Sequence, residues 1–128
     1  MSVHDLNPKQ ARRLLDVLNY ARKVVQYSKG IELAPFLTDE MRQLTLERCF
    51  EVIGEASRHL TPETVAQIGG LPLEKMRGLR NLISHDYHSV EAPVILRIAQ
   101  QNVPLLVEQI EPYEKQLYVA ANLEFPTS

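Results

Sequence analysis

The sequence predicts an all-α fold, an antiparallel bundle of four to five helices. Apolar residues recur at three- and four-residue steps through several long segments, as on one face of a helix. Proline and glycine fall where those segments would begin or end. No segment shows the strict alternation typical of a strand. With 128 residues and 45% apolar content, we expect one domain over residues 1–128 with one core, and a short polar tail from about residue 120.

The first helix is expected between two clear signals. Asn7 is a good N-cap residue, Pro8 suits the first helical turn, and Gly30 is a typical stop. Between them the apolar stripe consists of Ala11, Leu14, Leu18, Ala21 and Val25. This pattern predicts one long amphipathic helix.

A second helix is expected to begin near Thr38 and to end before Thr61-Pro62. Thr61-Pro62 indicates the start of a short third helix, and Gly69-Gly70 should end it. We expect its inward side to consist of Met41, Thr45, Cys49, Val52, Ile53, Ala56 and Leu60. Cys49 is the single cysteine of the chain, which excludes an intramolecular disulfide and favours a buried thiol.

Three prolines organise the remaining helices. Pro72 should open a helix whose apolar side carries Met76, Leu79, Leu82 and Ile83. Pro93 should begin another with Val94, Ile95 and Ile98, and Pro104 should kink or restart it. The last helix is expected to carry Leu105, Leu106, Ile110 and Leu117.

Charge is unevenly distributed along the chain. The net charge is −2, so any contact with a polyanion must come from a local patch. Residues 9–29 hold six basic side chains against Asp16 alone, whereas the C-terminal part is acidic. A solvated basic face opposite the apolar stripe explains this better than a dedicated binding surface does. No signal peptide or membrane-spanning run is recognisable, so we expect a cytoplasmic protein.

Residues 80–88, with the sequence RNLISHDYH, concentrate the chemistry. At about 100° per residue, six of the polar side chains would share one side of a regular helix, whereas Asp86 would point to the apolar side. We therefore expect the helix to end or bend at His85-Asp86. A solvated helix face is the simplest alternative. His85 and His88 could also suggest a metal pair, but no third ligand is evident.

The sequence resembles the HEPN domains of the HepT toxin family. The resemblance rests on Arg80-Asn81, three intervening residues, His85, Asp86 and Tyr87, and on the Ile-Gly-Glu-Ala stretch within residues 50–60. Residues 14–30 resemble the first helix of the family, and residues 90–106 resemble the helix that follows the motif. The match covers most of the chain, and the two motifs together are fairly specific.

The resemblance implies a HEPN-like bundle in a symmetric dimer, acting as a ribonuclease that needs no metal or other cofactor. Arg80 and His85 would be catalytic, in an Arg-x4-His arrangement, and Asn81 would support them. Histidine can transfer protons near neutral pH, and arginine offers a fixed charge and a planar donor fork for phosphate oxygens. Because one chain supplies one such histidine, two copies would provide both an acid and a base.

The resemblance also implies a partner. In HepT-like proteins the motif tyrosine, here Tyr87, is the target of an MntA-like nucleotidyltransferase antitoxin that attaches AMP. The added phosphate would be able to pair with Arg80 and block the RNA site. The leading hypothesis is therefore the toxin half of a prokaryotic toxin–antitoxin pair that cleaves RNA.

Two other hypotheses remain at this point. The chain could be a non-catalytic HEPN module that binds a nucleotidyltransferase and assists it, which the modest net charge favours slightly. It could also be a helical scaffold, in which case substitution of Arg80 or His85 would change stability rather than any activity.

Overall fold

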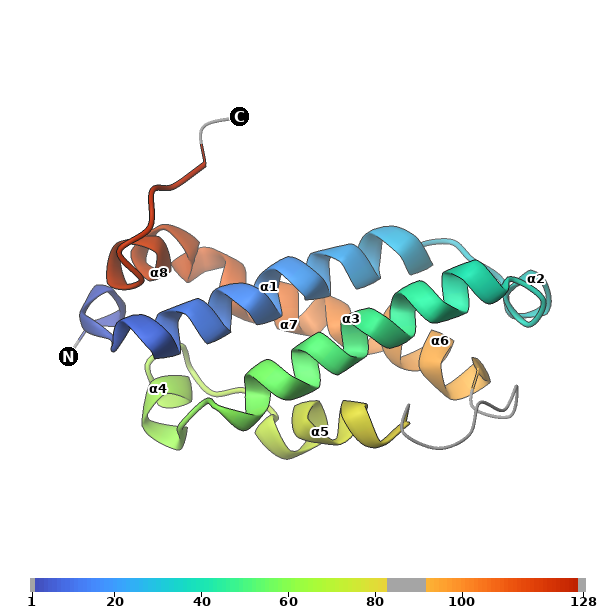
Figure 1. Cartoon of the computed structure of the whole chain (residues 1–128), viewed down its shortest axis with the longest axis horizontal. Helices are drawn as coiled ribbons and strands as arrows, with labels where there is room; N and C mark the ends of the chain where they lie inside the picture. The colour runs from blue at the N-terminus through green and yellow to red at the C-terminus, as the bar shows by residue number, and fades with distance from the viewer. Residues whose placement is uncertain (1, 83–91, 127–128) are drawn as a thin grey trace.

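The computed structural model describes residues 2–82 and 92–126, and these form an all-α bundle (Figure 1). No strand occurs within these two ranges, so the predicted fold class is confirmed. The two longest helices, α1 (Pro8–Ser28) and α3 (Glu40–Arg58), pack against each other and run in opposite directions. The chain returns behind them through α6 (Ala92–Gln101) and α7 (Val103–Ile110).

Helix α1 begins and ends as the sequence predicts. The side chain of Asn7 accepts a hydrogen bond from the backbone N–H of Lys9 at 2.8 Å, and Pro8 opens the first turn. Gly30 follows the helix with φ +73°, a conformation that glycine adopts without strain. The predicted stripe is buried except for Val25, which is partly buried.

Helix α3 forms where expected, but part of its inward face was predicted wrongly. Asp39, rather than Thr38, caps the helix by accepting a hydrogen bond from the backbone N–H of Arg42. Met41 is 80% exposed, whereas Leu46 and Phe50 are fully buried. Met41 lies about 180° around the helix from Phe50, because nine residues at about 100° each amount to two and a half turns. The buried stripe therefore excludes Met41.

Short elements connect the long helices. Two of them confirm the helix starts predicted at prolines. They are α4 (Pro62–Ala66), which Thr61 caps, and α5 (Leu73–Gly78), which follows Pro72. The chain ends α6 at Gln101 and starts α7 at Val103, so Pro104 marks a restart as predicted. The other elements are η1 (Val3–Asp5), α2 (Leu33–Phe36), η2 (Leu79–Leu82), η4 (Glu111–Tyr113) and α8 (Glu114–Ala120).

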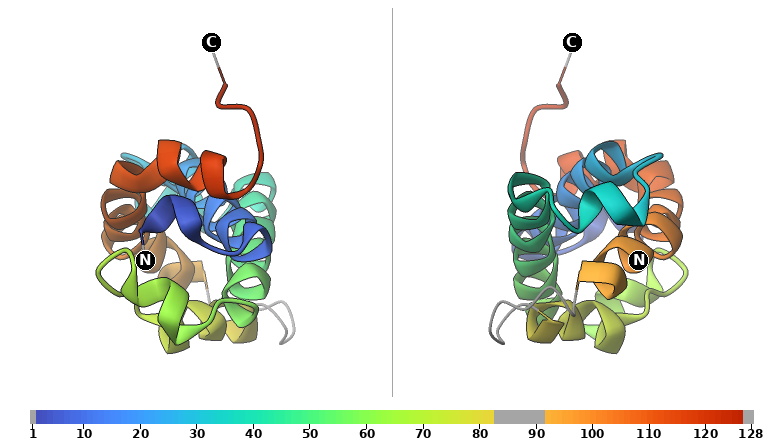
Figure 2. Two further views of the ribbon diagram at one scale, coloured as in Figure 1. Left: turned by 90° about the vertical axis from the view of Figure 1, so that its left-hand side faces the viewer. Right: turned by 90° about the vertical axis from the view of Figure 1, so that its right-hand side faces the viewer.

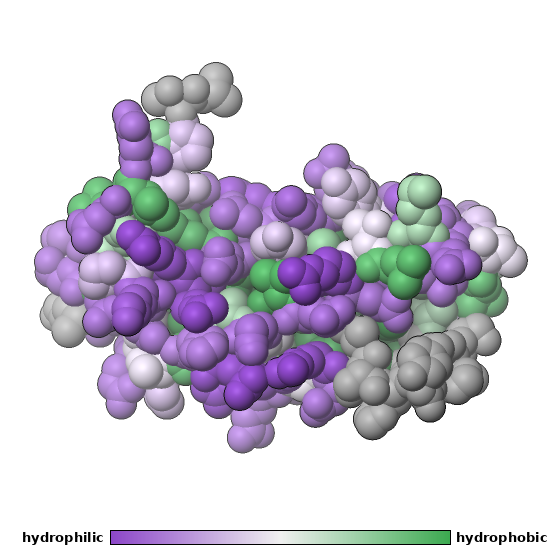
Figure 3. Space-filling view, viewed as in Figure 1, coloured by the Kyte–Doolittle hydropathy of each residue, from purple (hydrophilic) through white to green (hydrophobic). Residues whose placement is uncertain are grey.

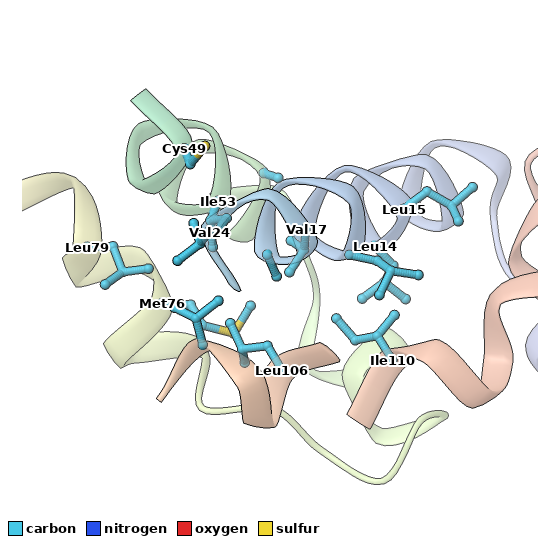
Figure 4. Close-up of a cluster of buried hydrophobic side chains, with 14 of the residues drawn as sticks. Leu14, Leu15, Val17, Val24, Cys49, Ile53, Met76, Leu79, Leu106 and Ile110 are labelled. Carbon is cyan, nitrogen blue, oxygen red and sulfur yellow. The ribbon is translucent and has the colours of Figure 1, made fainter. Parts of the chain in front are cut away.

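The core lies between α1, α3, α5 and α7. End-on views show the helices surrounding it and the C-terminal tail projecting away (Figure 2). In the close-up, Met76 and Leu79 point from α5 and η2 toward Val24 and Ile53 (Figure 4). Cys49 is buried as predicted, and burial raises the pKa of its thiol. Leu105, expected to be part of the apolar stripe, is 56% exposed.

The basic first helix and the acidic C-terminal part meet in space. The guanidinium of Arg22 donates hydrogen bonds to both carboxylate oxygens of Glu114 and to Glu111, each at 2.8 Å. Arg12 donates to the backbone carbonyl of Ala121. Two of the six basic residues in the stretch thus hold the C-terminal helices onto α1, which supports a structural interpretation of this part of the charge pattern.

Among the helices of the described residues, none combines the length and the apolar character that a membrane span needs.

Candidate active site

Arg80 stands where the helix after Pro72 changes its geometry. The α-helical part, α5, ends at Gly78, and residues 79–82 continue as the 3₁₀ turn η2. A 3₁₀ turn advances about 120° per residue instead of about 100°. The angles that a regular helix would give to Arg80, Asn81 and Leu82 therefore do not apply.

Two kinds of contact hold α5 and η2 in place: buried apolar side chains, and hydrogen bonds to the end of α3. Met76 and Leu79 are buried in the core, so the opposite side of this segment, with Arg80 and Asn81, faces outward. The guanidinium of Arg77 donates hydrogen bonds to the backbone carbonyls of Ser57 and Leu60 at 3.1 and 2.9 Å. Those carbonyls lie at the C-terminal end of α3, where a helix leaves acceptors unpaired and attracts positive charge.

Gly54 allows the closest approach between the two elements. It is buried within α3, and a Cβ atom at this position would lie 3.1 Å from the Cβ of Arg80 and 3.2 Å from its backbone nitrogen. Such contacts are shorter than ordinary packing allows, so a larger residue would require η2 to move. The absence of a side chain at Gly54 therefore sets the position of the Arg80 backbone.

The neighbouring residue, Glu55, contacts two arginines. Arg58, one turn further along α3, donates from Nη1 to both carboxylate oxygens at 3.0 and 3.1 Å. Nη1 of Arg80 lies 3.7 Å from Oε1 of Glu55. The Arg80 side chain is 51% exposed. Its guanidinium is thus held loosely at one corner and is accessible to a ligand.

An open pocket of about 230 Å³ lies beside these residues, between α1 and α3. Side chains of both charges line the pocket. Three are basic and three are acidic, and Val52 and Ala56 lie beside them. The charged residues are Arg13, Arg48, Arg80, Asp16, Glu51 and Glu55. The pocket is therefore not a uniformly basic groove, and positive charge for a phosphate must be delivered by individual arginines.

The predicted site residues divide into two groups. Arg80 and Asn81 belong to η2, and both are exposed. His85 and Tyr87 lie outside the described residues, as do Ser84, His88 and the expected end of the helix at His85-Asp86. The metal alternative at His85 and His88 likewise falls there. Of the two predicted catalytic residues, Arg80 is therefore among the described residues and His85 is outside them.

Sequence reasoning did not assign a role to Gly54, Glu55 or Arg58 at the site. One signal was present in the sequence, because glycine in the interior of a helix is unfavourable and often marks a close backbone approach. The Ile-Gly-Glu-Ala stretch contains this glycine and the acidic residue after it. Their contacts with Arg80, which is 26 and 25 positions away in the sequence, arise only from packing.

Comparison with known families decides the assignment. The family model described as "Ribonuclease HepT-like" matches residues 17–113, which include both α3 and the segment containing Arg80. The chain belongs to the HepT-like ribonuclease family. This confirms the resemblance seen in the sequence and identifies the bundle as a HEPN domain of the HepT type.

Individual relatives agree with this membership. "Putative RNase MJ1380" of Methanocaldococcus jannaschii is 30% identical over 98 residues, covering 77% of this chain and 90% of the relative. "Probable ribonuclease HepT" of Thermococcus cleftensis is 24% identical over 102 residues, covering 80% and 93%. "Putative RNase TTE0752" of Caldanaerobacter subterraneus subsp. tengcongensis is 25% identical over 95 residues, covering 74% and 85%. No solved structure matches the HepT-like chain significantly.

Proposed function

We propose that this HepT-like protein is a metal-independent endoribonuclease and the toxin of a prokaryotic toxin–antitoxin pair. The observation that carries the proposal is the position of Arg80. A member of a ribonuclease family presents this arginine with a half-exposed side chain beside an open pocket. A guanidinium in that setting can bind two oxygens of a phosphate at once.

The proposed reaction is a transesterification within the RNA backbone. A base removes the proton of the ribose 2′-hydroxyl, and the 2′-oxygen attacks the adjacent phosphorus. The bond from phosphorus to the 5′-oxygen breaks, and an acid protonates that oxygen. The products are a 2′,3′-cyclic phosphate and a free 5′-hydroxyl. Arg80 stabilises the extra negative charge of the pentacovalent phosphorus, and His85 transfers the protons.

Two proton-transfer groups are required, and the motif supplies one histidine per chain. We therefore propose a symmetric homodimer that brings two copies of His85 to one cleft. An apolar surface supports this part of the proposal. Tyr27, Met41 and Leu44 are exposed on α1 and α3 around an open pocket of about 490 Å³. This pocket shares Arg48 with the pocket beside Arg80.

Figure 3 shows the same face of the molecule. Hydrophobic residues lie in separate groups among hydrophilic ones, one group over the parts of α1 and α3 nearer α2 and another over α8 (Figure 3). Exposed apolar groups rimmed by polar ones are typical of protein interfaces. A contact between two copies here would lie on the face that also carries Arg80.

Control of the enzyme is assigned to Tyr87. We propose that an MntA-like nucleotidyltransferase antitoxin transfers AMP from ATP to its hydroxyl, as the family resemblance implies. The tyrosine oxygen loses its proton and bonds to the α-phosphorus, and pyrophosphate leaves. The phosphodiester that results carries a negative charge seven positions after Arg80 in the sequence. It would compete with the RNA phosphate for Arg80 and silence the nuclease.

The test uses the purified full chain, a fluorescent single-stranded RNA and an excess of EDTA. Wild-type protein should cleave the RNA, whereas Arg80→Ala and His85→Ala should each lose at least a hundredfold in kcat/KM. Arg97→Ala, which removes another exposed arginine on α6, should cleave like wild type. Cleavage by the Arg80→Ala, His85→Ala double variant at the wild-type rate would refute this mechanism.

A second function is favoured by one observation. The balanced charges around the pocket, three basic and three acidic, give little general attraction for a polyanion. This suits a non-catalytic module that binds a nucleotidyltransferase. Expression of the gene alone separates the two functions, because the nuclease should stop growth and the binding module should not.

A helical scaffold without activity would give a third result. The Arg80 and His85 variants would differ from wild type in stability, and neither they nor the wild-type protein would cleave RNA.

A further inference from the structure

Glu55 lies between two arginines and contacts them unequally. Its carboxylate accepts two hydrogen bonds from Arg58, at 3.0 and 3.1 Å, and one oxygen lies 3.7 Å from Nη1 of Arg80. We propose that Glu55 is a positioning residue for the nuclease: anchored by Arg58, it holds the guanidinium of Arg80 at the mouth of the pocket. This inference rests on the proposed ribonuclease function and adds Glu55 and Arg58 to its machinery.

The backbone alone cannot position the guanidinium. Gly54 brings α3 against the Cα and Cβ region of Arg80, which fixes where the side chain starts. Beyond Cβ an arginine side chain still has several rotatable bonds, and half of this one is exposed. A free guanidinium would sample many positions, and only a few of them can reach a phosphate in the pocket. A second tether near the end of the side chain is therefore needed, and Glu55 provides it.

The unequal contacts suit such a tether. Because Arg58 donates to both oxygens of Glu55, the carboxylate has a fixed place on α3 before Arg80 approaches. The longer contact to Arg80 involves one nitrogen of the guanidinium, so with respect to Glu55 its other N–H donors can turn to a ligand. Arg80 can then bind a phosphate with its other donors without losing Glu55, so its orientation is kept in the transition state.

The alternative is that Glu55 only adds negative charge near the RNA. The two roles predict different kinetics. Removing a repelling charge strengthens RNA binding and leaves the chemical step intact. Removing a tether of Arg80 weakens stabilisation of the transition state, which lowers kcat while KM stays unchanged or falls. The separation of kcat from KM therefore distinguishes positioning from charge.

The experiment compares Glu55→Gln with Glu74→Gln in the full-length protein, with the RNA assay in EDTA. Gln keeps the shape of Glu and loses the charge. Glu74 is exposed on α5, outside the pocket, so its substitution changes the net charge equally. Glu55→Gln should lower kcat about tenfold without raising KM, a smaller loss than removal of a stabilising donor causes. Arg58→Ala should lower kcat in the same direction, and Glu74→Gln should leave kcat unchanged.

A second readout does not depend on catalysis. The side-chain Nε–H signal of Arg80 in an NMR spectrum should show greater mobility in Glu55→Gln than in wild type or Glu74→Gln. Thermal unfolding should be nearly unchanged in every variant, because exposed ion pairs contribute little stability. Wild-type kcat together with an unchanged Arg80 signal in Glu55→Gln would overturn the inference.

The inference and the proposed function fail in different ways. If wild-type protein does not cleave RNA, the ribonuclease proposal fails, and Glu55 is then judged by the mobility of Arg80 alone. If wild-type protein cleaves and Arg80→Ala does not, the proposal holds, and an unaffected kcat in Glu55→Gln counts against the positioning role alone.

Discussion

Gly54 and Arg80 pack so closely that a methyl group on Gly54 would lie 3.1 Å from the Cβ of Arg80. The contact joins the middle of the motif in α3 to the first residue of the motif in η2, although the two residues are 26 positions apart in the sequence. A catalytic arginine must be held to within a fraction of an ångström to stabilise a transition state. Under the proposed function, the contact between these two residues would connect core packing to catalysis.

Replacement of Gly54 by alanine should damage both stability and activity. Alanine is favoured over glycine in a helix by about 0.5–1 kcal/mol, but overpacking costs about 1–3 kcal/mol. We expect a net loss of about 1 kcal/mol in the free energy of unfolding, and a larger relative loss of RNA cleavage because η2 must shift. Chemical denaturation and the cleavage assay measure the two effects.

Gly78→Ala is the matched control. Gly78 also lies in a helix, but nothing would contact its new Cβ within 4 Å. We expect this variant to be as stable as wild type or up to about 1 kcal/mol more stable, and to cleave RNA normally. If Gly54→Ala behaved in the same way, the close approach of α3 and η2 would not control the site.

The ion pair between Arg22 and Glu114 should make stability depend on pH. The hydrogen bonds that Arg22 donates hold the pKa of Glu114 below its ordinary value, against the opposing effect of partial burial. A lowered folded-state pKa means that the contribution is complete above the unfolded value of about 4.3. It disappears as the pH falls through the folded-state pKa.

Glu114→Gln should therefore reduce the free energy of unfolding at pH 7 by roughly 1 kcal/mol and have less effect at pH 3. Glu108→Gln, which changes an exposed carboxylate on α7, should have little effect at either pH. Thermal denaturation at the two pH values tests this. An equal destabilisation by Glu114→Gln at pH 3 and pH 7 would contradict the role of the charged pair.

The proposed dimer predicts that a charge at Leu44 disrupts assembly. Leu44 is 57% exposed beside Met41, and burying a lysine at an apolar contact is unfavourable. Leu44→Lys should shift the protein from dimer to monomer in sedimentation velocity and reduce RNA cleavage. Val119→Lys, at an apolar residue on α8 that is 63% exposed, should leave the dimer intact. A Leu44→Lys variant that remains dimeric would exclude this face as the interface.

The proposed control by AMP predicts modification at one tyrosine. After co-expression with an MntA-like nucleotidyltransferase, the peptide containing Tyr87 should gain the mass of one or more AMP units. The modified protein should no longer cleave RNA. Tyr87→Phe should remove the modification, whereas Tyr27→Phe should not, although Tyr27 is exposed. Mass spectrometry decides the site. A modified Tyr87→Phe protein would place AMP elsewhere.

Much of the fold could be predicted from local signals. The starts and ends of helices depend largely on neighbouring residues in the chain. Examples are the starts at Asn7-Pro8 and Thr61-Pro62 and the glycine stops at Gly30 and Gly69-Gly70. The error at Met41 shows the limit of such reasoning. Periodicity identifies a helix with an apolar face, but which residues at its edge are buried depends on where the neighbouring helices lie.

The sequence by itself determined the family and the all-α class, and it supplied the prediction that Arg80 is a site residue, because these follow from motifs and from periodicity along the chain. Only the tertiary structure brought Gly54, Glu55 and Arg58 to Arg80, and Arg22 to Glu114. The physical reason is that close contacts and ion pairs depend on distance in space. Residues far apart in the sequence become neighbours only when the helices pack.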